Sequence, residues 1–338
     1  KIGPKKSGLL AMLFWVTGLL GTAYALSIHN LTLLYLFYGI IGGIGLGIGY
    51  ITPVSTLVKY FPNRPGFATG LAIMGFGFAS LIAGPLMQFL VAQFGLVNNF
   101  IILGVIYLVI MGASSLYLKA PQQKHSTRTT KDKSTMYVHT HGMLANDAMK
   151  TWQFGALWWV FFINITCGIG LLSLASPMAQ EAIGMTPTAA ASLVGIIGIF
   201  NGGGRIAWST ISDYLGRAKT YILFFIIEIV AFYLLAQTNS ALTFQILILL
   251  IITCYGGGFS CMPAYLADLY GIRQLSTIHG RILTAWGLAG ITGPMLVSYF
   301  HEAGYGYTTA LECFAALFVL NTIIAIVLKI YGKRELHN

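Results

Sequence analysis

The 338-residue sequence is 57% hydrophobic and 8% charged, and it carries a formal net charge of +10 at pH 7. This composition excludes an ordinary soluble domain and predicts an all-α membrane protein. A helix needs about 20 apolar residues to cross a bilayer. Ten runs of roughly that length are present, and we predict transmembrane helices at residues 8–26, 31–58, 66–91, 97–118, 152–174, 189–209, 220–235, 242–263, 278–300 and 308–331.

The basic residues lie in alternate loops. Lysine and arginine occur at residues 59–64, 119–150, 217–219, 273 and 329–334, whereas the intervening loops at 27–30, 92–96, 176–188, 236–241 and 301–307 contain neither. Because cytoplasmic loops of membrane proteins are enriched in these residues, we expect both chain ends to be cytoplasmic in a plasma-membrane protein. The positive charge then indicates contact with anionic lipid, and we expect no nucleic-acid partner.

A polar segment divides the chain into residues 1–118, a cytoplasmic linker at 119–151, and residues 152–338. The linker contains His125, His139 and His141, but neither cysteine nor paired acids accompany them, so we expect solvated histidines and no metal site. The four cysteines all fall in apolar spans without a CxxC pair. They indicate reduced packing residues, and no cofactor is expected.

An internal repeat relates the two parts of the chain. "IGPKKSGLL" at residue 2 parallels "LGRAKTYIL" at residue 215, and the pairs Pro53 with Pro263 and Pro85 with Pro294 have offsets that agree within a few residues. The second part has two helices before this motif, whereas the sequence begins inside the first copy. We therefore expect a twelve-helix protein of two pseudo-symmetric halves, of which helices 3–6 and 7–12 are present and the first two are not. Paired repeats of this kind are typical of secondary transporters.

The segment "STISDYLGRAK", residues 209–219, resembles the cytoplasmic signature of the major facilitator superfamily, and "KIGPKK" resembles the end of its first copy. Within that superfamily, "FNGGGRIAWSTISDYLGRAKT", "KYFPNRPGFATGLAIMGFGF" and "TAWGLAGITGP" resemble the oxalate/formate antiporter family. The resemblance covers nearly the whole chain. It implies a small carboxylate substrate that binds between the halves and is moved by alternating access, either as an anion exchanger or as a proton-linked carrier.

The signature also predicts a gate. Asp213 and Arg217 are four residues apart and can pair with each other, and with Asp268 or Arg273 on the same side of the membrane. Exposed ion pairs contribute only about 0–1 kcal/mol each, so such a latch can be broken in every cycle. Gly216 and Lys219 complete the signature. The alternative is that these residues only anchor helix ends.

Arg205 is the main candidate for binding the substrate. It lies eight residues before Asp213, about 12 Å into the membrane at the rise of an α-helix. An intramembrane cation is costly and normally faces a cavity or a counter-charge. The resemblance places this arginine against the substrate carboxylate, which a guanidinium can bind through two parallel hydrogen bonds. The alternative is a structural pair, for example with Glu228.

One position departs from the resembled family. The oxalate exchanger carries a second cation, a lysine, where this sequence has Trp286. A single central cation favours a monocarboxylate such as formate, lactate or pyruvate over oxalate. Arg281, five residues earlier, could compensate for the missing cation or reach the cytoplasmic interface, and we favour the interface.

Aromatic residues are further candidates. The resemblance places Tyr50, Phe76, Tyr255 and Phe259 on cavity-facing positions, although ordinary packing explains each equally well. Glu228 lies deep in its span and could hold a proton for coupled transport or neutralise a basic residue.

Two other functional classes remain as alternatives. The spans contain no grouping of a nucleophile with a base, so we do not expect an enzyme. A non-transporting sensor of carboxylates that keeps a transporter fold is the second alternative. We expect a monomer surrounded by membrane lipid.

Overall fold

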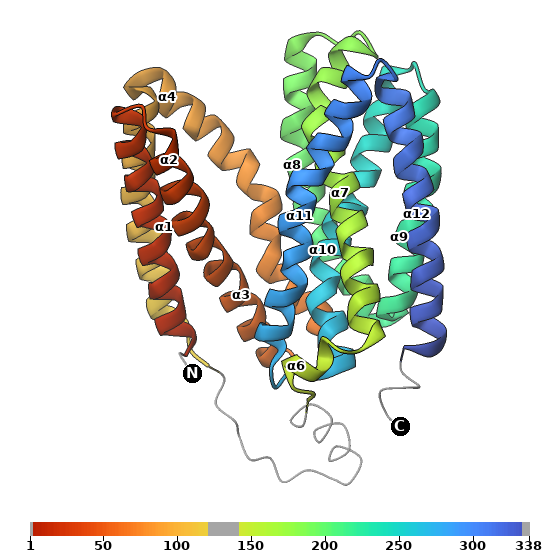
Figure 1. Ribbon diagram of the computed structural model, residues 1–338, viewed down its shortest axis with the longest axis horizontal. Helices are drawn as coiled ribbons and strands as arrows, with labels where there is room; N and C mark the ends of the chain where they lie inside the picture. The colour runs from red at the N-terminus through yellow and green to blue at the C-terminus, as the bar shows by residue number, and fades with distance from the viewer. Residues whose placement is uncertain (1–2, 121–141, 333–338) are drawn as a thin grey trace. The chain divides into compact units, whose positions relative to one another are not determined.

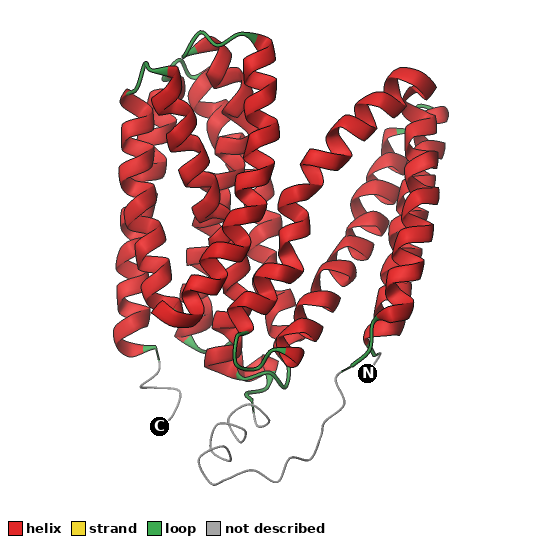
Figure 2. Ribbon diagram, turned by 180° about the vertical axis from the view of Figure 1, so that it is seen from behind, coloured by secondary structure: helices red, strands yellow, loops and turns green. Residues whose placement is uncertain are grey.

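The computed structural model describes residues 3–120 and 142–332. Within these ranges every regular element is helical, and no strand occurs (Figure 2). Nine of the described helices are long and apolar enough to cross a membrane. The predicted all-α membrane fold is therefore confirmed. The three linker histidines fall outside the described residues.

The first helices follow the predicted runs closely. They are α1 (Pro4–Ser27), the short α2 (Leu31–Leu34), the π-helix η1 (Tyr35–Gly42) and α3 (Gly43–Tyr60). The stretch Leu31–Tyr60 forms one continuous apolar helix of 30 residues. Asn30 begins it, because its side-chain oxygen accepts a hydrogen bond from the backbone N–H of Leu33.

Helix α4 (Pro65–Tyr117) contains two predicted spans in one element of 53 residues. At about 1.5 Å per residue this length is more than twice that of a single crossing. The backbone leaves helical geometry at Gly95, where φ is 79° and ψ is 168°. Glycine tolerates such a φ because it has no Cβ. The break falls inside the predicted loop at 92–96, so α4 accounts for both spans.

The described chain forms two compact units. Unit 1 comprises Lys1–Tyr60 and Ile82–Thr127, and unit 2 comprises Phe61–Leu81 and Arg128–Asn338. In unit 1, α1 packs against α3 and η1. Its apolar core joins Leu19 to Leu90 and Leu103 of α4, and the Trp15 ring contacts Tyr107 edge-on at 5.9 Å.

Unit 2 contains the start of α4, the short α6 (Ala145–Ala148) and six long helices (Figure 1). These are α7 (Trp152–Glu181), α8 (Pro187–Leu215), α9 (Arg217–Gln237), α10 (Ala241–Tyr270), α11 (Leu275–Glu302) and α12 (Gly306–Tyr331). The helix pairs that pack over the greatest extent are α8 with α10, α9 with α12 and α7 with α11. Thr151, Thr186 and Ser240 cap three of these helices through their side-chain oxygens.

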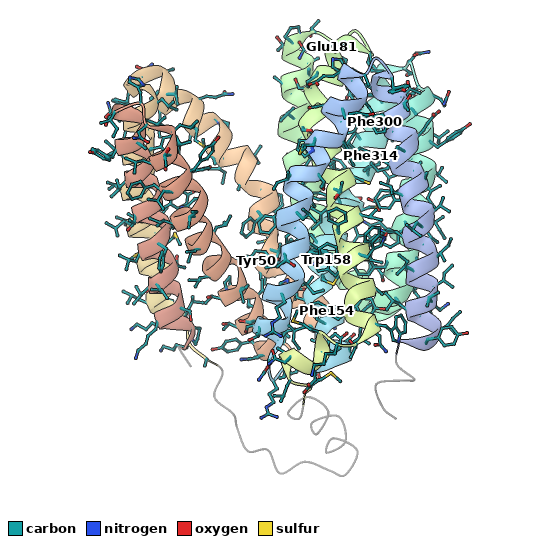
Figure 3. All side chains as sticks on the ribbon, viewed as in Figure 1. Tyr50, Phe154, Trp158, Glu181, Phe300 and Phe314 are labelled. Carbon is teal, nitrogen blue, oxygen red and sulfur yellow. The ribbon has the colours of Figure 1, made fainter. Side chains whose placement is uncertain are left out.

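Aromatic rings fill the interior of unit 2. Phe314 of α12 is fully buried and meets Phe232 of α9 edge-on at 5.6 Å, and the Phe225 and Phe318 rings are tilted to each other at 5.6 Å. Figure 3 shows Phe314 inside this group of helices, with Phe154 and Glu181 near opposite ends of α7. These large apolar rings pack closely against one another, and this packing holds the helices in fixed register.

Candidate functional site

Arg205 lies on α8 with only 4% of its surface exposed. Its Nε donates a hydrogen bond of 3.1 Å to Oδ1 of Asn201, one helical turn earlier. This bond fixes the plane of the guanidinium group, because a residue four positions away lies on the same helix face. The sequence interpretation did not single out Asn201, although its spacing from Arg205 offered a signal.

Two of the predicted aromatic residues lie with Arg205. The Arg205 Cζ is 5.0 Å from the centre of the Phe259 ring of α10, within the range of a cation–π contact. The Phe259 ring in turn meets the Trp286 ring of α11 edge-on at 5.3 Å. We call Arg205, Phe259 and Trp286 the arginine cluster. It joins three helices around one buried cation.

Close packing of α8 on α10 supports the arginine cluster. A Cβ added at Gly256 would lie 2.6 Å from the Asn201 carbonyl oxygen and 3.2 Å from Cγ of Arg205. Ser260 Oγ, one turn later, donates a 2.8 Å hydrogen bond to the Arg205 carbonyl oxygen. The glycine run "YGGGF", residues 255–259, therefore permits close helix contact beside Arg205.

The remaining predicted aromatic residues have different surroundings. Tyr255 is buried, and its ring packs against Gly168 of α7. Phe76, on the part of α4 that belongs to unit 2, is 40% exposed. Tyr50 is 1% exposed on α3 in unit 1. The structure thus brings Phe259 and Trp286 into direct contact with the Arg205 region.

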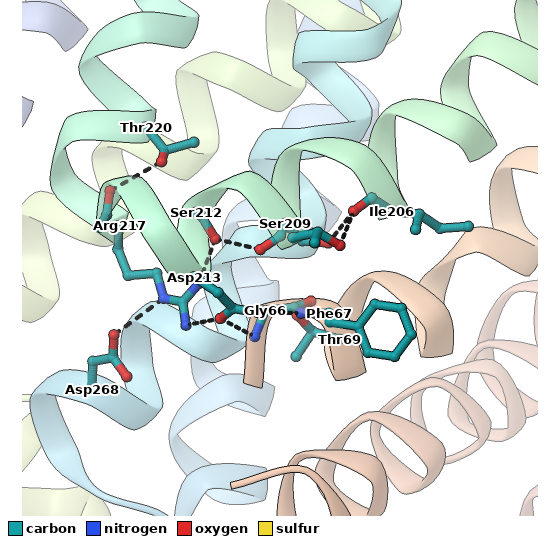
Figure 4. A network of polar contacts seen from close by, with 12 residues as sticks. Gly66, Phe67, Thr69, Ile206, Ser209, Ser212, Asp213, Arg217, Thr220 and Asp268 are labelled. Atoms are coloured by element: carbon teal, nitrogen blue, oxygen red, sulfur yellow. Dashed lines mark hydrogen bonds and ion pairs between the residues drawn. The ribbon is translucent and has the colours of Figure 1, made fainter. Parts of the chain in front are cut away.

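The signature residues form a network of polar contacts (Figure 4). Arg217 at the start of α9 donates to Asp213 Oδ1 through Nη2 at 2.6 Å and to Asp268 Oδ2 through Nε at 3.1 Å. It also donates to the Ser212 hydroxyl. We call Ser212, Asp213, Arg217 and Asp268 the signature network. It connects the α8–α9 corner to α10.

Asp213 has a second role that residue types did not reveal. Its two carboxylate oxygens accept hydrogen bonds from the backbone N–H groups of Gly66 at 2.8 Å and Phe67 at 2.9 Å (Figure 4). These donors belong to the first turn of α4, where N–H groups have no partner within the helix. Asp213 therefore caps α4 from a different helix, and its negative charge also complements the helix dipole.

Among the described residues, Lys219, Arg273 and Arg281 take no part in the hydrogen bonds and ion pairs of the signature network. Lys219 and Arg273 are exposed and form no ion pair within the described residues. Arg281 donates a 2.7 Å hydrogen bond to Asn146 Oδ1 of α6. The expectation that Arg281 reaches the membrane interface stays a prediction.

Glu228 is 1% exposed on α9, and its Oε2 lies 3.4 Å from the Asn164 Nδ2 of α7. Among the described residues Glu228 forms no ion pair. The sequence interpretation considered a pair with Arg205, and the structure gives Glu228 a neutral amide instead. Across residues 3–120 and 142–332 no group of three His, Cys, Asp or Glu side chains is placed to hold a metal ion.

Comparison with known proteins extends these observations. The family model described as Major Facilitator Superfamily matches residues 1–227 and 157–336, which together span nearly the whole chain. An uncharacterized transporter of this type from Escherichia coli (strain K12), YhjX, is 30% identical over 278 residues. That match covers 81% of this chain and 67% of the relative.

Two further relatives carry names that describe a substrate. The oxalate:formate antiporter of Oxalobacter formigenes is 26% identical over 296 residues, covering 86% of this chain and 68% of the antiporter. The apicoplast pyruvate carrier 1 of Toxoplasma gondii is 21% identical over 315 residues, covering 75% of this chain and 57% of the carrier.

Solved structures give the same fold. The transporter FucP of the same superfamily, in its outward conformation, superposes with a TM-score of 0.72 at 16% sequence identity. The superposition covers 96% of this chain and 83% of FucP. At this identity the likeness concerns the fold alone. The family match, the relatives and the helical architecture agree, and the chain belongs to the Major Facilitator Superfamily of membrane transporters.

Proposed function

We propose that this transporter moves a small monocarboxylate, such as formate, lactate or pyruvate, across the plasma membrane. The observation that carries the proposal is the burial of Arg205 in a membrane-spanning helix, with Phe259 and Trp286 beside it. An ionisable residue inside a membrane span is costly and normally faces a cavity or a counter-charge, and the carboxylate of an organic anion would be such a counter-charge. The relatives named for oxalate, formate and pyruvate support a carboxylate substrate.

The arginine cluster suits an anion with one carboxylate. A guanidinium group presents a planar fork that matches the two oxygens of a carboxylate. Phe259 and Trp286 add apolar surface that suits the carbon part of a small organic acid. In the resembled oxalate exchanger a second cation stands at the position of Trp286, so a dianion would have one charge here without a partner.

Transport would follow alternating access, in which the binding site opens to one side of the membrane at a time. We assign the signature network the role of a gate, because its ion pairs lie at helix ends and connect α8, α9 and α10. The coupling is either exchange of two anions or symport with a proton. Glu228 is our candidate for the proton, and the active unit is proposed to be a monomer.

Counterflow in liposomes tests the substrate and the role of Arg205 together. Full-length protein would be reconstituted with unlabelled substrate inside, and the uptake of labelled formate, lactate, pyruvate and oxalate measured. We expect saturable exchange of at least one monocarboxylate and little exchange of oxalate. Arg205→Gln removes a charge-assisted, bidentate contact and should weaken apparent affinity about 10- to 100-fold, whereas Arg205→Lys keeps the charge and should lose less.

Arg281→Gln is the matched control, because it removes the same charge from a different helix, where Arg281 contacts Asn146. We expect it to retain exchange. Transport unaffected by Arg205→Gln would remove the central residue from the proposal. Strong oxalate exchange that depends on Arg281 would show a second functional cation, and binding without any counterflow would favour a sensor.

A further inference from the structure

A separate pocket opens at the end of unit 2 that carries the signature network. It has a volume of about 230 Å³ and lies between the α8–α9 corner, α10 and α12. Its charged lining residues are Arg217, Lys219, Lys329 and Asp268. The arginine cluster contributes nothing to it. From this pocket we propose that the protein binds the phosphate headgroup of an anionic phospholipid, and that Lys219 and Lys329 are the main contacts.

The charges of the pocket favour an anion. Asp268 is the one acid among the described residues of the lining, and its carboxylate is already engaged by Arg217 at 3.1 Å. Lys219 and Lys329 are both exposed, and neither forms an ion pair within the described residues. Two ammonium groups therefore line one cavity, and no acid of the described chain pairs with either of them. A phosphate diester carries one negative charge and offers acceptor oxygens to both.

The backbone adds donors to the same pocket. Arg217, Ala218 and Lys219 all line it, and they form the first turn of α9. Gly216 precedes them and also lines the pocket, but its own N–H donates to the Ser212 carbonyl oxygen at 3.0 Å. No side chain caps this turn. N–H groups of a first turn need an acceptor from outside the helix, which a phosphate oxygen can supply.

The surface beside the pocket favours a lipid over a soluble phosphate. Helices α9 and α12 pack side by side (Figure 1), and Lys219 and Lys329 are each the third residue from the adjacent helix ends. Along both helices, large apolar side chains remain exposed: Ile226 and Val230 on α9, and Ile323, Ile326 and Ile330 on α12. A headgroup in the pocket would place its acyl chains against this apolar surface.

The location agrees with the distribution of anionic lipid. The lysines lie at the end of the helices that carries the basic loops, which we expect to face the cytoplasm. Anionic phospholipids are enriched in that leaflet. Because Arg217 and Asp268 line the pocket and also belong to the signature network, a bound headgroup would contact the proposed gate directly.

The test measures lipid binding, so it stands independently of transport. Purified full-length protein would be exposed to equal amounts of phosphatidylglycerol and phosphatidylcholine, and the bound lipid counted by native mass spectrometry. We expect wild type to retain phosphatidylglycerol preferentially. The double variant Lys219→Gln/Lys329→Gln should bind it about 10- to 30-fold less tightly. Lys219→Arg/Lys329→Arg keeps both charges and should retain the lipid.

Lys59→Gln/Lys119→Gln is the matched control, because it removes two exposed lysines from unit 1 and leaves the pocket intact.

A photoactivatable phosphatidylglycerol should crosslink to residues 215–219, 265–269 or 328–329 in wild type. Glycerol phosphate at millimolar concentration tests the soluble source, and displacement of the lipid by it would identify a free phosphate ligand instead. Equal retention of the two lipids by wild type, or unchanged retention in the Gln variant, would overturn the proposal.

Discussion

Asp213 is the residue on which most contacts of the signature network converge. Its carboxylate accepts two backbone hydrogen bonds from α4 and one from the Arg217 guanidinium, and only 5% of its side chain is exposed. An amide of the same shape has a single acceptor oxygen and carries two donors instead. It cannot satisfy all three donors. The need for a carboxylate at this position is therefore structural as well as electrostatic.

We predict that Asp213→Asn lowers the stability of the protein substantially. Removing one partner of a buried ion pair typically costs about 3–5 kcal/mol, because the other charge stays buried without compensation. The Arg217 side chain is 6% exposed and would keep only the partly exposed Asp268 as its counter-charge. The midpoint of thermal unfolding in detergent, followed by light scattering and intrinsic fluorescence, measures the effect.

Asp268→Asn provides the comparison within the same network. Asp268 pairs with the same arginine, but 33% of its side chain is exposed, so water compensates for its loss. We expect a cost of about 1 kcal/mol or less. Equal losses of stability in the two variants would mean that the contacts of Asp213 with α4 contribute nothing beyond an ordinary ion pair.

At the scale of helices, the start of α4 packs closely against the end of α8. A Cβ at Gly66 would overlap the Ser209 carbonyl oxygen and lie 2.7 Å from Asp213 Oδ1. Only glycine allows the first turn of α4 to approach this near. The close approach is also what brings the Gly66 and Phe67 N–H groups within hydrogen-bond distance of Asp213.

Gly66→Ala should therefore displace α4 from α8. Overpacking a tight contact typically costs about 1–3 kcal/mol, and the two backbone hydrogen bonds to Asp213 would be lengthened in addition. Gly75→Ala on the same helix is the control, since nothing lies within 4 Å of a Cβ there. We expect Gly75→Ala to leave the unfolding midpoint unchanged or raise it slightly, because alanine favours a helix. A Gly66→Ala variant as stable as wild type would contradict the packing argument.

The elements show what the sequence could and could not predict. Long apolar runs identified every spanning helix, and the break at Gly95 fell within a predicted loop, because lipid imposes both length and hydropathy on a span. The pairing of Asp213 with Arg217 was predicted from their spacing of four residues, although the two lie on either side of the break at Gly216, near the end of α8 and at the start of α9. The capping of α4 by Asp213 could not be predicted, since backbone N–H groups are the same at every residue except proline. The contact between Arg205 and Phe259 depends on how α8 and α10 pack, and one sequence does not fix that register.

For the whole molecule, the alternation of helices predicts the side on which each connection lies. Within unit 2, α7, α8 and α9 follow one another as long spanning helices, so the residue before α7 and the residue after α9 belong to opposite ends of the bundle. Lys150 precedes α7 and Asn239 follows α9, and both are exposed. The distribution of basic residues assigns the Lys150 end to the cytoplasm.

Cysteine labelling in intact cells tests this topology. Cys167, Cys254 and Cys261 are buried, and Cys313 is partly exposed, so a Cys313→Ala background should react little with a membrane-impermeant maleimide. In that background we expect Asn239→Cys to be labelled in intact cells, and Lys150→Cys to be labelled only after the membrane is permeabilised. Labelling of Lys150→Cys before permeabilisation would invert the topology. The lipid pocket at Lys219 and Lys329 would then face the outer leaflet, and its preference for an anionic headgroup would need another explanation.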